Sequence, residues 1–364
     1  MQKVITHAGL DVHAERIVIA TLEGQSREPV VRDIPNDAKV IRRTFQRLAK
    51  EAYELRCCYE AGPCGFELHR QLTKMGIACE VIAPGLIPVR AGDRVKTDRR
   101  DATKLARLFR AGELTSITVP SSDQEAVRDL VRLRDNIRKD LTAARSRLQH
   151  FLLRHGRAYR CGSGWTQRYW VWLRAQHFDR ECERLTFEHY VHEVEHQQAR
   201  RTEVDAEVQR TARTEPYAAS VAKLVCLRGL STLSAMVLLT EIGDFRRFET
   251  PRELMAFVGL VPREHSSGGT VRRGGITKTG NSLVRRVLIE AAWHYRHRPV
   301  FGPKAGRCVQ GQSPEVIEYV RKAQARLFRR YTRLVSRGKK SQVAAAAVAR
   351  ELCGFTWGLM TAAA

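Results

Sequence analysis

The first 120 residues alternate short hydrophobic runs with amphipathic segments. Residues 4–22 carry two apolar runs separated by a short polar turn, which predicts a hairpin, and Val30–Ile34 predicts a third strand. Residues 37–52 place apolar side chains at helical spacing. Two further strands are predicted over Leu55–Tyr59 and Ala78–Ile82, each followed by a helical pattern. The predicted order is β-β-β-α-β-α-β-α.

That order predicts an α/β ribonuclease-H-like domain with a mixed sheet and helices on both faces. In this fold, acidic residues at the end of the first strand, at the end of the fourth strand and on a later helix converge. Here those places are held by four carboxylates: Asp11, Glu60, Asp98 and Asp101. Four converging carboxylates repel one another unless cations lie among them. Two Mg²⁺ ions, roughly 3.5–4 Å apart, would relieve the repulsion and hold a scissile phosphate.

The segment from Val95 to Ala106 is the most informative one. Asp98 and Asp101 are three residues apart, which places them on one face of a helix. Four cations surround them: Lys96, Arg99, Arg100 and Lys104. Oxygen ligands inside a basic field suit a metal ion that acts on a polyanion. The alternative is that Asp98 only caps the helix and Asp101 lies in its first turn.

Residues 121–215 predict a helical hairpin, either a spacer or a self-association arm. A capping box of Ser122 and Glu125 would open its first helix. Five apolar residues then keep the 4-3-4-3 spacing of a coiled-coil seam: Ile137, Leu141, Ala144, Leu148 and Phe151. Residues 157–182 interrupt the pattern with aromatic residues, which either stack on bases or, as we favour, pack the tip or a partner protomer.

A zinc-protease pattern, His-Glu-x-x-His, occurs at residues 192–196 of the second helix of this hairpin. Its neighbours are polar, so a solvated helix face is the better interpretation.

Residues 216–364 predict a mainly helical C-terminal domain. Two short helices around Gly229–Ser231 resemble a helix-hairpin-helix that offers backbone N–H groups to a phosphate. Residues 257–282 contain six glycines interspersed with cations, among them Arg272, Arg273 and Lys278, and a basic helix with Arg285 and Arg286 follows. Glycines allow close approach of a phosphate, and Ser266 or Ser267 could attack one. From these residues alone, a phosphate-binding loop without a nucleophile is the preferred interpretation.

Composition points to a polyanionic partner. The 364 residues carry a formal net charge of +24, and the sequence pI is about 10.2. DNA or RNA is the expected partner of so basic a chain. The nine cysteines form no Cys-x-x-Cys pair, which favours reduced thiols in the cytoplasm over a zinc or disulfide framework. We expect no signal peptide and no membrane span.

Five segments together resemble the DEDD transposases of bacterial insertion sequences, of the insertion-sequence-110 type, now understood as recombinases guided by a bridge RNA. The resemblance covers nearly the whole chain. The Lys-Thr-Asp-x-x-Asp-Ala run is its sharpest piece. The matching segments are residues 9–13, 59–62, 96–102, 259–280 and 337–352.

The resemblance implies a RuvC-like domain over residues 1–120 that uses Asp11, Glu60, Asp98 and Asp101 with Mg²⁺ or Mn²⁺. It implies an oligomerising coiled-coil linker over 121–215, and hence a dimer or tetramer. It also implies a C-terminal transposase domain over 216–364 whose serine bonds covalently to DNA. Ser267 matches that serine best, and Ser266 is the alternative. The predicted partners are DNA and a noncoding bridge RNA. Two other functions stay open: a RuvC-like junction nuclease that uses metals alone, and a non-catalytic nucleic-acid-binding protein.

Overall fold

The computed structural model describes residues 4–88, 97–264, 266–267, 269–299 and 309–362. The chain divides into two compact units, Met1–Pro120 and Ser121–Ala364. Each has its own hydrophobic core. We describe each unit by itself.

The first unit contains one five-stranded mixed sheet, ordered β3-β2-β1-β4-β5. β2 is antiparallel to both β1 and β3, whereas β4 is parallel to β1 and β5 is parallel to β4. This arrangement confirms the predicted mixed sheet and is consistent with a DEDD nuclease-like domain. The elements are β1 (Ile5–Val12), β2 (Arg16–Glu23), β3 (Val30–Pro35), α1 (Ala38–Glu51), β4 (Glu54–Glu60), α2 (Glu67–Lys74), β5 (Ala78–Ile82), η1 (Pro84–Leu86) and α3 (Asp98–Arg110).

The two faces of this sheet are covered by different helices. Leu10 of β1 packs into a cluster that contains Phe45 of α1 and Leu72 of α2. On the other face, Ala102 and Ala106 of α3 pack against β2. Alternation along β1 therefore turns its even-numbered residues toward α1 and α2, and its odd-numbered residues toward α3.

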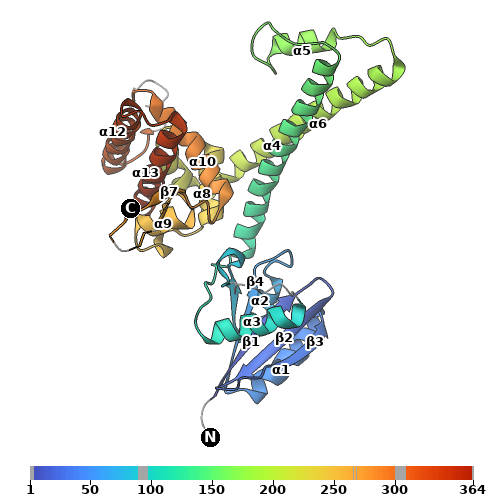
Figure 1. Cartoon of the computed structure of the whole chain (residues 1–364), viewed down its shortest axis with the longest axis vertical. Helices are drawn as coiled ribbons and strands as arrows, with labels where there is room; N and C mark the ends of the chain where they lie inside the picture. Colours follow the sequence, from blue (N-terminus) through green and yellow to red (C-terminus); the bar gives the residue numbers. More distant parts are fainter. Residues whose placement is uncertain (1–3, 89–96, 265, 268, 300–308, 363–364) are drawn as a thin grey trace. The chain divides into compact units, whose positions relative to one another are not determined.

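The second unit is mainly helical. Its helices are α4 (Ser122–Arg154), α5 (Gln167–Arg174), α6 (Glu181–Thr211), α7 (Ala218–Leu224), α8 (Thr232–Ile242), η2 (Phe245–Arg247), α9 (Pro251–Phe257), α10 (Ser282–Ala292), η3 (Trp293–Arg296), α12 (Pro314–Ser336) and α13 (Ser341–Thr361). Helices α4 and α6 pack side by side along much of their length (Figure 1).

The start of α4 corrects our prediction for the capping box. The cap is Ser121, not Ser122, and its partner is Gln124, not Glu125. Ser121 Oγ accepts from the Gln124 amide at 3.2 Å, and Gln124 Oε1 accepts from the Ser121 amide at 3.2 Å. Both registers satisfy the sequence pattern, and only the backbone geometry selects one. The five residues of the predicted seam are all buried.

The aromatic residues of the 157–182 segment pack the end of the α4–α6 pair. Tyr169 is buried, and Trp165, Trp170 and Trp172 are half-buried against the same cluster. The Arg145 guanidinium lies 4.7 Å from the Trp165 ring centre. These contacts favour the packing interpretation over base stacking. The zinc-protease pattern lies on α6 with His192 and His196 exposed, as a solvated helix face requires.

The C-terminal helices of this unit enclose a single large core. Helix α13 is long and apolar enough, by length and composition, to cross a membrane. Its buried residues, among them Val348 and Leu352, belong to this core. A core helix of a water-soluble fold passes the same test, so α13 is explained by packing against α9, α10 and α12.

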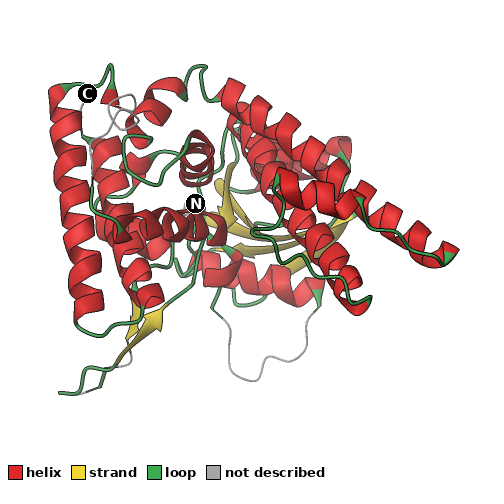
Figure 2. Ribbon diagram, turned by 90° about the horizontal axis from the view of Figure 1, so that it is seen from above, coloured by secondary structure: helices red, strands yellow, loops and turns green. Residues whose placement is uncertain are grey.

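We predicted a simple loop for the glycine-rich segment, but it forms a short hairpin. Strands β6 (Pro262–Glu264) and β7 (Arg273–Ile276) pair antiparallel. They form the small yellow sheet that stands apart from the helices of this unit in Figure 2. Only its backbone pairing makes this hairpin recognisable, because strands of three and four residues carry almost no periodic signal.

Candidate metal centre and nucleic-acid site

Asp11 lies at the end of β1, on the face that α3 covers. Two residues earlier on that face is Gly9, against which α3 packs directly. A Cβ on Gly9 would lie 2.3 Å from the amide nitrogen of Ala106 and 2.4 Å from the carbonyl oxygen of Ala102. Only glycine permits that approach. Since Asp98 precedes Ala102 by one helical turn, the close packing brings the first turn of α3 to Asp11.

The start of α3 is fixed by Thr97. Its side chain accepts from the Arg100 amide, so Thr97 is the N-cap. The alternative that Asp98 caps this helix is therefore wrong. Asp98 is the first residue of the helix and Asp101 lies in the first turn, which leaves both carboxylates available for other ligands.

Asp11, His13 and Asp98 form one group. One ligand atom from each lies within 4.8 Å of the others. His13 Nε2 lies 3.2 Å from Asp11 Oδ2 and 3.7 Å from Asp98 Oδ1. Arg16, at the start of β2, pairs with the other oxygen of Asp98. Thus the β1–β2 turn supplies a ring nitrogen, and the first residue of β2 supplies a cation, to these carboxylates.

The surroundings of Asp11, above all its partial burial, disfavour its ionised form. Burial raises the pKa of the Asp11 carboxyl, and the charges of Asp98 and Asp101 raise it further. His13 acts in the opposite direction through its hydrogen bond and its charge, but does not cancel the rise. A cation bound beside Asp11 would remove this penalty.

Glu60 and Asp101 stand near this group without joining it. Gly9 pairs with Cys58 in the parallel ladder, and Cys58 packs against Leu105 of α3. Glu60 follows Cys58 by two residues, as Asp11 follows Gly9, so both acids lie on one face at one edge of the sheet. Glu60 is exposed and has no ion pair among the described residues. Asp101 acts on Asp11 through its charge.

These residues fit a divalent metal ion. Carboxylate oxygens are the ligands that Mg²⁺ prefers, and a histidine nitrogen beside them is better suited to Mn²⁺. Asp11 and Asp98 would hold the ion, and His13 would be a further donor. Glu60, at the end of β4, and Asp101, in the first turn of α3, lie near these ligands. Arg16 would have to release Asp98 for both of its oxygens to bind.

The predicted basic residues divide between the two units. Arg99 and Arg100 are exposed on α3, beside Asp98, while Lys104 is half-buried. Lys96 lies outside the described residues. In the second unit, Arg272 and Lys278 are exposed on the hairpin segment. Arg273 begins β7, and its side chain lies outside the described part.

The base of the β6–β7 hairpin is held firmly. A Cβ on Gly259 would lie 2.0 Å from the Thr279 carbonyl oxygen, and one on Gly280 would lie 1.9 Å from that of Phe257. Arg285 Nη1 donates to the carbonyl oxygens of Val258 at 2.8 Å and Thr279 at 3.1 Å. Arg285 therefore supports the hairpin rather than presenting a free guanidinium to a phosphate.

The two candidate serines differ in their hydrogen bonds. Ser266 Oγ donates to Glu264 Oε1 at 2.9 Å. Ser267 is exposed, and its backbone forms a bridge with Thr270 in both directions at 3.2 Å. The backbone of Ser267 is thus held at an exposed position of the hairpin. Ser267 belongs to the second unit, and the acidic residues belong to the first.

Sequence reasoning did not assign roles to His13 and Arg16. His13 follows the end of β1 and Arg16 begins β2, and the proximity of both to Asp98 arises from the packing of α3. A histidine two residues after a strand-end aspartate is the only signal that could have indicated His13.

Comparison with known proteins identifies the family. Residues 8–156 match the profile of the DEDD-type transposases of IS110 elements, described as "Transposase", and residues 222–303 match that described as "Transposase IS116/IS110/IS902 family". The chain is 43% identical over 357 residues to "Putative transposase y4qE" of Sinorhizobium fredii, covering 96% of this chain and 87% of that protein. This chain belongs to the IS110 family of transposases.

Two further transposases extend the similarity. The "Transposase for insertion sequence element IS1533" of Leptospira borgpetersenii is 36% identical over 339 residues, covering 92% of this chain and 98% of that protein. The "Transposase for insertion sequence element IS1328" of Yersinia enterocolitica is 25% identical over 307 residues, covering 80% and 79%. The matched length includes both units, so this IS110-family chain corresponds to nearly the whole of the IS1533 transposase.

Proposed function

We propose that this IS110-family protein cleaves and rejoins DNA strands by a metal-assisted attack of Ser267, and that a noncoding bridge RNA selects the DNA. Membership of a transposase family implies an enzyme that cleaves and rejoins DNA. The observation that supports the acidic centre is the placement of Asp11 and Asp98, whose ligand atoms lie within 4.8 Å of each other and of His13.

The proposed centre consists of Asp11, Glu60, Asp98 and Asp101, with His13 as an additional donor. Bound there, Mg²⁺ or Mn²⁺ would polarise the scissile phosphate and neutralise charge on its oxygens. Asp11 and Asp98 hold this position through the packing of α3 on β1. Arg99 and Arg100, on the exposed side of α3, lie where a DNA backbone would approach the carboxylates.

In the proposed reaction, Ser267 Oγ forms a bond to phosphorus while the phosphorus–oxygen bond to the leaving strand breaks. The serine proton passes to water or a base, and the leaving oxygen takes up a proton. The covalent phosphoserine conserves the phosphodiester bond energy, so attack by another strand's hydroxyl regenerates Ser267 and joins DNA. Ser267 is preferred because it matches the family's serine, directly before a glycine. Ser266 is the alternative, since its hydroxyl donates to Glu264, which could act as a base.

The RNA guide is supported by the excess of positive charge and by the resemblance of motifs in both units. With a net charge of +24, the chain has more cationic surface than the acidic centre needs. A second polyanion would be the natural ligand of the cationic surface that DNA at the acidic centre does not use. RNA that copurifies with the protein should be sequenced, and its removal should abolish site-selective cleavage.

Denaturing gels separate the proposed function from the two alternatives. The protein, its copurified RNA and DNA carrying the element ends are incubated with Mg²⁺. A covalent DNA–protein adduct supports the serine reaction. Nicked DNA without an adduct would instead indicate a junction nuclease that uses metals alone. Binding with neither product would indicate a non-catalytic nucleic-acid-binding protein.

A further inference from the structure

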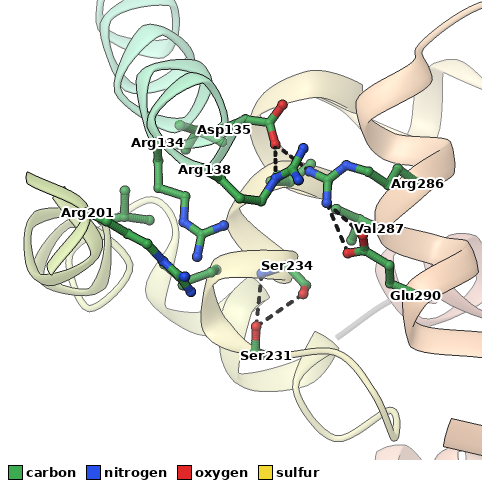
Figure 3. A pocket seen from close by; sticks show the side chains of 13 residues that line it. Arg134, Asp135, Arg138, Arg201, Ser231, Ser234, Arg286, Val287 and Glu290 are labelled. Atoms are coloured by element: carbon green, nitrogen blue, oxygen red, sulfur yellow. Dashed lines mark hydrogen bonds and ion pairs between the residues drawn. The ribbon is translucent and has the colours of Figure 1, made fainter. Parts of the chain in front are cut away.

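The second unit contains a cavity of about 300 Å³, at the low end of the ~300–1,000 Å³ usual for ligand pockets. It is lined by side chains from α4, α6 and α10 and by the N-cap and first two turns of α8. Four of its residues are arginines: Arg134, Arg138, Arg201 and Arg286. In Figure 3 the guanidinium groups of Arg134 and Arg201 point into the space above Ser231 and Ser234.

Carboxylates fix the arginines in place without neutralising them. Asp135 is 6% exposed and accepts from Arg138 Nε at 2.8 Å and Arg286 Nη2 at 2.6 Å. Burial alone would raise the pKa of Asp135, but hydrogen bonds from Arg138 and Lys139 and the charge of Arg286 hold it below its usual value.

Two further acids complete this network. Asp205 Oδ1 accepts from Arg134 Nε at 2.6 Å, and its other oxygen lies 3.5 Å from Arg201 Nε. Glu290 accepts from Arg286 Nη1 at 2.9 Å.

The lining has an excess of two positive charges, because four arginines face two carboxylates, Asp135 and Glu290. Their neighbours Asp205 and Lys139 leave that excess unchanged. Three of the arginine side chains are less than a third exposed, at 17% for Arg134 and 29% for Arg138 and Arg286. Charges in such partly dry surroundings attract an anion more strongly than charges in open water.

Helix α8 adds to this field. Ser231 is its N-cap, and its side chain accepts from the Ser234 amide at 3.2 Å. The first turn of the helix, which lines the cavity, carries the positive end of the helix dipole. The turn before it is fixed by Gly229, where a Cβ would lie 2.4 Å from the carbonyl oxygen of Ala291 in α10. This is the helix-hairpin-helix segment predicted from the sequence.

We propose that this cavity binds a phosphodiester group of a nucleic-acid strand. The proposal rests on the proposed function only in requiring that the chain act on nucleic acid. One guanidinium group can donate two parallel hydrogen bonds to two oxygens of a phosphate, whereas a lysine ammonium acts as a point charge. Arginines held in a fixed orientation therefore suit an extended phosphodiester backbone better than mobile lysines would. The cavity thereby gives the α4–α6 helices and the C-terminal core a common contact with one strand.

Two arginines of α6 provide a matched test. Arg201 lines the cavity, whereas Arg210 is on the same helix, pairs with Glu207 and lies outside the lining. Arg201→Gln and Arg210→Gln remove the same charge. Binding of the full-length variants to a labelled DNA duplex and to an RNA hairpin is measured over a series of KCl concentrations.

We expect Arg201→Gln to weaken binding several-fold and to reduce the salt slope by about one, while Arg210→Gln keeps the wild-type slope. A change with DNA alone, RNA alone or both identifies the strand that occupies the cavity. Equal behaviour of the two variants on both polymers would overturn the proposal.

A second pair of variants separates binding from folding. Ser234→Asp introduces a carboxylate into the cavity at the third position of α8, where an acid stabilises a helix. Ser313→Asp adds the same charge at the exposed N-cap of α12. Ser234→Asp should lose about tenfold in affinity with an unchanged or higher melting temperature, and Ser313→Asp should bind as wild type. Unaltered nucleic-acid binding by Ser234→Asp would contradict phosphodiester binding in the cavity. An Asp11→Ala variant that still cleaves DNA would instead contradict the proposed function.

Discussion

The backbone of Ala106 occupies the space that a side chain on Gly9 would need. The distance from a Cβ on Gly9 to the Ala106 amide nitrogen would be 2.3 Å, and neither backbone segment can yield easily. Four residues apart on α3, Asp98, Ala102 and Ala106 lie along one side of the helix. The glycine thereby determines how closely Asp98 approaches Asp11.

Gly9→Ala is expected to separate these carboxylates. The added methyl group must push α3 from the sheet, which we expect to destabilise the first unit by about 1–3 kcal/mol and to reduce metal-dependent cleavage. Denaturant unfolding and cleavage assays measure the two effects. Gly85→Ala is the control, since its Cβ would meet nothing within 4 Å. Equal stability of the two variants would show that the α3 contact is not limiting.

Asp11→Asn should stabilise the metal-free protein above neutral pH while abolishing activity. A raised pKa means that ionising Asp11 costs more in the folded than in the unfolded state, so the carboxylate lowers stability at pH values above that pKa. At acid pH, below the unfolded pKa, the gain should vanish because the carboxyl is protonated in both states. Thermal melting between pH 3 and pH 8 measures this, with Glu51→Gln, an exposed acid of α1, as control.

Mn²⁺ or Mg²⁺ should raise the melting temperature of the wild type in proportion to the logarithm of its concentration above the Kd. Asp11→Asn and Asp98→Asn should lose this response. His13→Ala should weaken the response to Mn²⁺ more than that to Mg²⁺, because a nitrogen ligand contributes more to Mn²⁺. Identical metal responses of all variants would rule out the proposed ligand set.

Ser267→Ala should eliminate the covalent adduct while DNA and RNA binding persist. Ser266→Ala should retain the adduct, because Ser267 is the serine that matches the family's nucleophile. Adduct formation is measured on denaturing gels after protease digestion. An adduct that persists in Ser267→Ala and disappears in Ser266→Ala would transfer the role to Ser266.

Glu241→Ala should destabilise the second unit by about 3 kcal/mol. The Glu241 side chain is 3% exposed and accepts from Arg132 Nε at 2.6 Å, Arg132 Nη2 at 2.9 Å and Asn281 Nδ2 at 2.7 Å. Its loss leaves Arg132 and Asn281 without their carboxylate. Urea unfolding measures the change. Glu207→Ala removes an exposed pair on α6 and should show no measurable effect.

The order of elements in the first unit and the four acidic positions could be predicted from local sequence patterns. Helix α1 illustrates the reason: Asp37 caps it, and Ile41, Phe45 and Leu48 form one buried side, so local pattern and tertiary packing agree. The same agreement holds for Asp98 and Asp101 in the first turn of α3. Charge and motif spacing likewise indicated a nucleic-acid enzyme before any contact was known.

Which residues come into contact depends on tertiary packing. His13 and Arg16 reach Asp98 because α3 packs on β1, a contact across more than 80 positions of sequence that no local pattern encodes. Strands as short as β6 and β7 are stabilised by pairing rather than by propensity, so the serine-bearing hairpin could not be predicted. The arginine-lined cavity likewise exists only because α4, α6, α8 and α10 converge, each carrying charges that look like ordinary surface residues in the sequence.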